Sequence, residues 1–102
     1  MKPGTQIAYI PEHVRLHFRE PQRLSHPDTE FGFVTSERGS VHFCRYWVKG
    51  QPGVLRTKAN SEATPTDCLV PHNSVLQSEV EFMMLAIEAN QSPHPIEIPD
   101  LR

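Results

Sequence analysis

Four side chains that could hold a metal ion lie in or beside one long loop of this 102-residue chain: His13, His26, Asp28 and Glu30. Imidazole and carboxylate groups are zinc ligands, and three protein ligands with an open position support hydrolysis. Their spacing matches no compact metal motif such as His-Glu-x-x-His. The sequence therefore admits a divalent metal at this loop and indicates no other cofactor.

The same residues also have a structural interpretation. A His-Pro-Asp run is ordinary turn chemistry, in which Asp28 bonds the backbone two residues on. Glu30 can pair with Arg45 or Lys49 across neighbouring strands. A metal-dependent site thus ranks behind the two binding functions described below.

A second group combines cations with an aromatic ring on two neighbouring predicted strands. Arg and Lys neutralise phosphates, and exposed aromatic rings stack on bases, so such a strand face could bind nucleic acid. The alternative is that the ring belongs to the core and the cations are solvated or meet acidic residues. An isoelectric point of about 6.3 opposes strong nucleic-acid binding. The group comprises Arg45, Trp47, Lys49, Arg56 and Lys58.

The two cysteines suggest little chemistry. Cys44 lies in the middle of a predicted strand, where a thiol is usually buried and inert. Cys68 has His72 nearby in sequence only. Because a Gly-rich phosphate loop and a Ser elbow are also lacking, we predict no catalytic residue and regard an enzyme as the minority interpretation.

The stretch that must organise the fold is residues 30–50. Phe31 to Thr35 and Val41 to Val48 are rich in aromatic and β-branched residues, which favour strands. Gly39 between them can take the positive φ of a tight turn, so the pattern predicts a hairpin. This hairpin holds most of the large apolar side chains, and the remaining elements should pack on it.

Shorter elements are predicted around this hairpin. Gln6 to Ile10 and Val54 to Ala59 read as strands, Thr66 to Leu69 as one helical turn, and Leu69-Val70 as a closing strand. Residues 12–20 alternate apolar and charged side chains, which favours a short edge strand or an extended arm over a helix. Residues 60–65 read as a loop.

One helix is predicted after these strands, starting at Ser74. Ser74-x-x-Gln77 has the form of a capping box. One apolar stripe follows at helical spacing, formed by Leu76, Val80, Met83, Met84 and Ile87. Phe82 and Leu85 lie off this stripe, so a second contact, with another subunit, the tail or the long loop, should cover them. Ile96 and Ile98 could anchor an extended tail in the same self-association.

Together these elements predict an SH3-like five-stranded barrel over residues 1–72, a C-terminal amphipathic helix over 73–91 and an extended tail over 92–102. They form a single domain, as the length requires.

Three runs of residues carry a resemblance. They are Gly4-Thr5-x-x-Ala8-Tyr9-Ile10-Pro11-x-His13, His26-Pro27-Asp28-x-Glu30-x-Gly32-Phe33-Val34-Thr35-Ser36 and Val41-x-Phe43-Cys44-Arg45-Tyr46. In these runs the chain resembles small bacterial and phage-encoded proteins of unassigned function. The resemblance covers roughly residues 4–70 and implies the SH3-like barrel, but no activity. The chain departs from the family pattern between His13 and His26, where the relatives have a shorter loop, and in Asp67-Cys68-Leu69, where the family has Asp-Leu.

Charge and composition restrict the remaining classes. The net charge of −2 hides a difference between a first part, residues 1–60, with net +4, and a second part, residues 61–102, with net −6. Such halves could attract each other or outside partners. Two cysteines and no apolar leader or membrane span favour a cytoplasmic protein. We therefore expect a non-enzymatic binding or assembly module. Protein–protein contact, including self-association through Phe82 and Leu85, ranks ahead of nucleic-acid binding.

Overall fold

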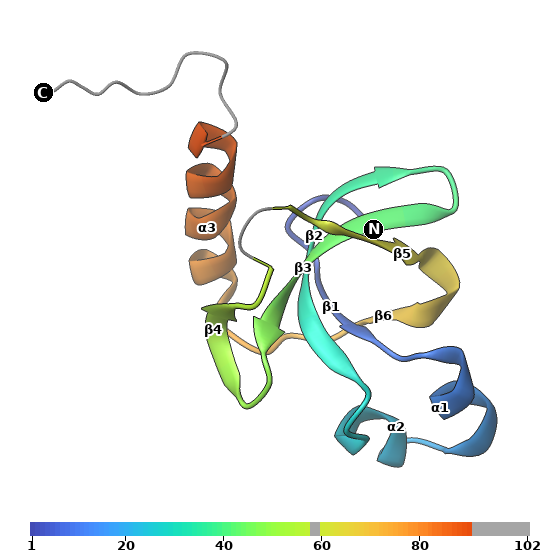
Figure 1. The fold of residues 1–102 in the computed structure, drawn as a ribbon. Helices are drawn as coiled ribbons and strands as arrows, with labels where there is room; N and C mark the ends of the chain where they lie inside the picture. Colours follow the sequence, from blue (N-terminus) through green and yellow to red (C-terminus); the bar gives the residue numbers. More distant parts are fainter. Residues whose placement is uncertain (58–59, 91–102) are drawn as a thin grey trace, which may run out of the picture.

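The computed structural model describes residues 1–57 and 60–90. There the chain forms an antiparallel six-stranded sheet with one long helix at its C-terminal end (Figure 1). The elements are β1 (Gln6–Tyr9), α1 (Glu12–His17), α2 (Gln22–Ser25), β2 (Glu30–Arg38), β3 (Val41–Val48), β4 (Gln51–Leu55), β5 (Glu62–Pro65), the 3-10 helix η1 (Thr66–Cys68), β6 (Leu69–Pro71) and α3 (Gln77–Asn90). The prediction of a mainly β fold with one C-terminal helix is confirmed. Lys58, Ile96 and Ile98 lie outside the described residues.

The sheet is open. Its strands follow the order β4-β3-β2-β1-β6, and β5 pairs with β3. One edge of β3 serves two partners, because its first half pairs with β5 and its last two residues pair with β4. In the described part of the chain, β5 and β6 are joined by η1 and do not pair with each other, so a closed five-stranded barrel is not seen.

The predicted central hairpin is present as β2 and β3, and it contains one unusually close backbone approach. Gly32 lies opposite Tyr46, and a Cβ placed on Gly32 would stand 1.9 Å from the carbonyl oxygen of Arg45. That distance is far inside van der Waals contact, so only glycine fits here. The requirement is one of space.

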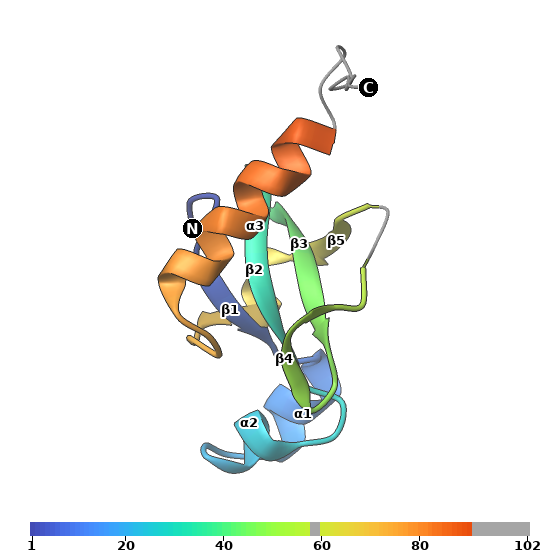
Figure 2. The ribbon, with the colours of Figure 1, turned by 90° about the vertical axis from the view of Figure 1, so that its left-hand side faces the viewer.

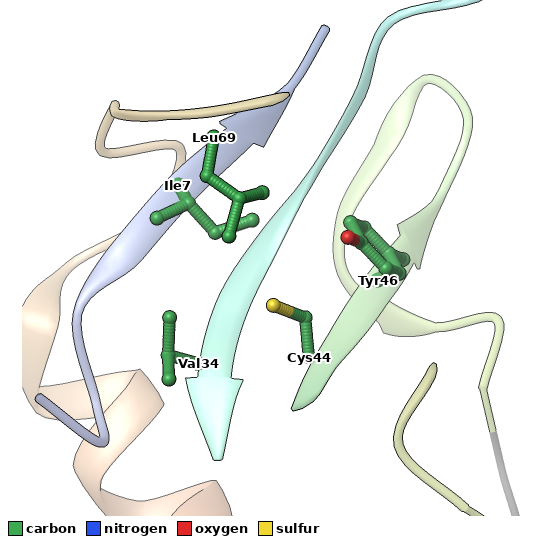
Figure 3. Packing of buried hydrophobic residues seen from close by; sticks show 5 residues of the cluster. All are labelled: Ile7, Val34, Cys44, Tyr46 and Leu69. Carbon is green, nitrogen blue, oxygen red and sulfur yellow. The ribbon is translucent and has the colours of Figure 1, made fainter. Parts of the chain in front are cut away.

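Apolar side chains cover both faces of the sheet. On one face Ile7, Val34, Cys44, Tyr46 and Leu69 converge from four strands to form a buried cluster (Figure 3). On the other face Phe33 and Trp47 pack with Val80 of α3, which lies across β2 and β3 (Figure 2). The hairpin thus contributes to both clusters, and the other elements pack on it as expected.

A buried glutamine joins the first strand to the start of α3. The side-chain oxygen of Gln6 accepts hydrogen bonds from the backbone N–H groups of Ser74 and Val75, at 2.9 and 3.1 Å. Its amide nitrogen donates to the carbonyl of Val75 at 2.9 Å and to Gln77 Oε1 at 3.1 Å. Since buried amides are costly to leave unpaired, this side chain fixes where α3 begins.

The predicted strand or arm over residues 12–20 is wrong. Residues 12–17 form α1, in which the N–H groups of Val14 and Arg15 bond to the carbonyl of Pro11. Val14 is fully buried, whereas Leu16 is 69% exposed, so the alternation does not mark one buried strand face. Pro11 is the N-cap of this helix. A backbone N–H at this position would have no partner within the helix, so proline loses no hydrogen bond here, and its presence favours a helix over a strand.

Two further expectations about strands are corrected. Residues 62–65, expected to be loop, form β5, where buried Thr64 meets the hydroxyl of Tyr46 at 2.6 Å. The strand expected at Val54 to Ala59 lies earlier, at Gln51–Leu55. β4 pairs with the end of β3 on either side of the turn at Gly50: Val48 lies opposite Gln51 and Trp47 opposite Leu55, with a register shift between the two pairs. The helical turn and closing strand around Leu69 are confirmed as η1 and β6.

The predicted capping box is also wrong. α3 begins at Gln77, three residues later than expected, and Leu76 precedes it with 71% of its surface exposed. The amide of Gln77 donates to the carbonyl of Gly4 at 2.8 Å, and the N–H of Ser74 is taken by Gln6. Contacts with the sheet thus replace the local cap. None of the helices in residues 1–57 and 60–90 is long and apolar enough to cross a membrane.

The close approach at Gly32 predicts a severe effect of one methyl group. We expect Gly32→Ala to lower the free energy of unfolding by about 3 kcal/mol or more, because the strands must separate to admit a Cβ. Urea denaturation measures this. Gly50→Ala is the control: space around Gly50 is open and its φ is +74°, so the conformational cost of about 1–2 kcal/mol stands alone. Equal losses in the two variants would contradict the steric argument.

The role of Gln6 predicts a local effect on α3. We expect Gln6→Ala to cost about 3 kcal/mol, since several backbone groups near Val75 lose their partner. Amide hydrogen exchange should accelerate in α3 more than in β2 and β3. The exposed Gln22→Ala should leave stability and exchange unchanged. If exchange in α3 did not rise in Gln6→Ala, the helix would be held by its apolar contacts alone.

Candidate functional site

Three of the four predicted metal ligands come together at the end of the sheet where α1 and α2 lie (Figure 1). His13 lies in α1, His26 follows α2, and Asp28 precedes β2. Each offers one ligand atom, and these atoms all lie within 4.8 Å of one another. His13 Nε2 is 2.7 Å from Asp28 Oδ2, and the Asp28 N–H donates to His26 Nδ1 at 3.0 Å.

Ring contacts and charge shape this cluster. The rings of His13 and His26 meet edge to face with centroids 5.9 Å apart, and Phe18 packs on His26 at 4.8 Å. The hydrogen bond with His13 holds the pKa of the Asp28 carboxyl below its usual range, with smaller contributions from the charges of His26, His13 and Lys49. The cluster is open to solvent, since the side chains of His13 and Asp28 are 57% and 55% exposed. Asp28 therefore stays ionised near neutral pH.

Glu30, the fourth predicted ligand, does not belong to this cluster. Its Oε1 lies 2.8 Å from Nη2 of Arg56, which also binds Glu62 at 2.8 Å. The expected partners, Arg45 and Lys49, are not the ones used. Glu30 is thus correctly interpreted as an ion-pair residue, with a different partner.

A cavity of about 200 Å³ begins beside the cluster at His26. Its wall includes Phe31 and Trp47 from the sheet and Lys49 from the turn after β3. Among the described residues, the indole N–H of Trp47 has no hydrogen-bond partner. His26 is the one residue that this cluster shares with the lining of the cavity.

The predicted nucleic-acid face is wrong for two of its members. Trp47 and Arg45 are each only 3% exposed, so neither ring nor guanidinium can meet a nucleic acid. Arg45 instead donates to the carbonyl of Thr57 at 2.7 Å, and Trp47 packs on Phe33 at 5.4 Å between ring centroids. The alternative that the tryptophan belongs to the core is confirmed.

The exposed cations of that group are only partly available. Arg56 lies between Glu30 and Glu62 and stacks 5.5 Å above the ring of Tyr46. Its hydrogen bonds with Glu62, together with the charges of both acids, raise the pKa of the guanidinium further. Lys49 is exposed beside the cavity. Nucleic-acid binding itself stays a prediction.

The helix α3 presents an apolar outward face. Val80 is fully buried against the sheet, and Phe82 lies two positions later, about 200° around the helix. Phe82 and Leu85 are 73% and 66% exposed, as expected for residues off the inward stripe. We define the outward face as Ser78, Phe82, Leu85, Ala86 and Ala89, all of which are exposed.

The structure adds two exposed apolar residues that sequence reasoning missed. Leu16 and Phe18, 69% and 40% exposed, lie in the α1–α2 lobe (residues 11–29). Basic residues flank both side chains in the sequence, but the alternation favours a short edge strand or an extended arm and does not single these two residues out as a surface. Both cysteines are free and buried, and burial raises the pKa of the Cys44 thiol, which makes it a poor nucleophile.

No protein-family model matches the chain, and searches of curated proteins and of solved structures give no significant match either. The resemblance noted from the sequence therefore stays a prediction. Function must be argued from the chain's own residues.

The burial of Trp47 and Arg45 predicts weak polyanion binding. We expect the protein to elute from heparin below physiological ionic strength, because Arg56 is already paired with two carboxylates. Lys49→Glu should change elution no more than Lys2→Glu, which removes the same charge at an exposed site elsewhere. Strong retention lost only in Lys49→Glu would instead support nucleic-acid binding at the cavity.

Proposed function

We propose that the chain is a non-enzymatic assembly module that binds further copies of itself head to tail. The outward face of α3 on one copy contacts the α1–α2 lobe of the next. The single observation that carries this proposal is the exposure of Phe82 and Leu85, at 73% and 66%, on a helix already packed through Val80. A helix with apolar residues on opposite sides needs cover on both.

Charge favours the lobe over a second α3 as the contact. All charged residues of α3 are acidic, namely Glu79, Glu81 and Glu88. Two such helices packed together would bring like charges close, which costs energy. The outward face therefore suits an apolar surface edged by cations.

The α1–α2 lobe offers such a surface. Leu16 and Phe18 are exposed within residues 13–19, which hold two arginines, two histidines and no acid, with Glu12 and Glu20 at the edges. Figures 1 and 2 both show α1 and α2 at the opposite end of the sheet from the C-terminal half of α3. Two different surfaces at opposite ends give a heterologous contact, which forms a ring or an open chain of copies.

We further infer that the sheet is an open variant of an SH3-like barrel. In support, β1 pairs with both β2 and the last strand, and β2, β3 and β5 follow as a meander before η1. A cytoplasmic location is part of the same proposal, supported by two free cysteines in a reduced state.

Two variants that place glutamate on one or the other contact surface test the assembly. We expect the wild type to show a mass above that of the monomer in sedimentation velocity at low salt, falling as salt screens the contact. Phe82→Glu with Leu85→Glu removes one contact surface, and Leu16→Glu removes the other, so each variant alone should be monomeric. Mixed together, they should form a heterodimer, because each supplies the surface that the other lacks.

The control and the contrary outcomes are distinct. Ser40→Glu, at an exposed turn outside both surfaces, should assemble like the wild type. A wild type that stays monomeric at millimolar concentration would refute self-assembly. If Leu16→Glu still dimerised while Phe82→Glu with Leu85→Glu did not, α3 would pair with itself, and the head-to-tail contact would be wrong.

A further inference from the structure

His13, His26 and Asp28 form a donor set in the α1–α2 lobe, outside the strands of the sheet. His13 lies in α1, and His26 and Asp28 lie in the segment between α2 and β2. His13 also belongs to the basic part of the proposed assembly surface, and Phe18 of that surface packs on His26. Two imidazoles and one carboxylate, with ligand atoms within 4.8 Å of one another, are the donor types of zinc sites that keep an open position.

We propose that these three residues bind one divalent transition-metal ion, with Zn²⁺ as the ion to be tested. Zinc–nitrogen and zinc–oxygen bonds of about 2.0–2.2 Å place the ligand atoms of a tetrahedral site about 3.3 Å apart. The pair His13 and Asp28 is already closer than this, at 2.7 Å. The remaining adjustment is on the order of 1.5 Å, within reach of side-chain rotation because His13 and Asp28 are more than half exposed.

Metal binding would replace hydrogen bonds that the cluster now makes. His13 Nε2 and Asp28 Oδ2 lie 2.7 Å apart, and His13 offers the Nε2 lone pair to a metal when its ring proton is on Nδ1. His26 Nδ1 accepts from the backbone N–H of Asp28, so coordination through that nitrogen ends this hydrogen bond as well. Because protons compete with the metal for the same lone pairs, binding should weaken in acid.

The backbone around the ligands is held in place without a metal. Arg23 donates to the carbonyl of Phe18 at 2.7 Å and to the carbonyl of Arg15 at 2.6 Å. Thr29 donates to the carbonyl of Arg23 at 2.5 Å, which closes the lobe just before β2. The ring of Phe18 restricts His26. A pre-ordered backbone lowers the entropic cost of gathering the ligands.

Solvent reaches the cluster, because the side chains of His13 and Asp28 are 57% and 55% exposed. Of the three ligands, only His26 also lines the cavity of about 200 Å³ beside Trp47 and Lys49. The charge of Lys49 opposes a bare cation in part, but it attracts an anion bound to that cation. Water or a small anion can therefore complete the coordination.

Calorimetric titration of Zn²⁺ into the untagged, chelator-treated 102-residue chain tests the site. We expect one ion per chain with micromolar or tighter affinity, and at least tenfold weaker binding at pH 5 than at pH 7. Asp28→Asn and His26→Ala should each weaken binding at least tenfold. His17→Ala removes an exposed histidine of α1 outside the cluster and should leave affinity unchanged. Mg²⁺, which prefers oxygen ligands, should not compete.

The contrary results are equally clear. Lack of saturable binding overturns the proposal, and so does unchanged affinity in both Asp28→Asn and His26→Ala. A loss in His17→Ala equal to that in His26→Ala would indicate surface histidines binding zinc without a defined site. Because Asp28→Asn keeps the shape of the side chain, circular dichroism matching the wild type excludes unfolding as the cause. The same titration on Phe82→Glu with Leu85→Glu, which lacks the assembly surface on α3, should bind zinc normally, so the metal site and the assembly contact fail independently.

Discussion

The side chain of Gln6 is the constraint on which the arrangement of sheet and helix depends. It is 2% exposed and pairs both its oxygen and its nitrogen with residues that begin α3. An amide in this setting has to be satisfied, so β1 and the start of α3 move as one unit. That coupling sets the rotation of the helix: Val80 points to the sheet and Phe82, two residues on, points to solvent. The apolar face of α3 that is available for assembly thus depends on the polar contacts of Gln6, which lies 68 and 69 residues before its partners Ser74 and Val75.

The parts of the fold that could be predicted are those determined locally. The hairpin of β2 and β3 follows from its β-branched and aromatic residues and from the turn at Gly39, and η1 and β6 follow from short-range signals. Two of the failures involve distant partners. Residues 62–65 form a strand because Thr64 finds Tyr46, and the capping box is lost because Gly4 and Gln6 compete for its groups. No local pattern encodes such competition.

The candidate site also has a part that could be predicted from the sequence and a part that could not. The chemistry of His13, His26 and Asp28 could be inferred from residue type, but the expected strand over residues 12–20 gave no reason for them to meet. The helix α1 supplies that reason, since it turns the chain back towards β2. Burial was harder to predict from the sequence than residue chemistry. Arg45 and Trp47 are residue types common on binding faces, yet Arg45 lies beneath Thr57 and Trp47 lies beneath α3.

The α1–α2 lobe takes part in both proposed functions. Its length is not constrained by the sheet, because β1 and β2 pair with each other whatever segment joins them. β1 and β2 pair from Gln6 opposite Phe33 to Tyr9 opposite Glu30, so the two ends of the lobe are brought together by the strands themselves. A segment inserted between paired strands costs little in loop closure and can vary without disturbing either core. Binding groups gathered on this lobe could therefore change independently of the sheet, while the opposite contact surface, α3, stays fixed by Gln6.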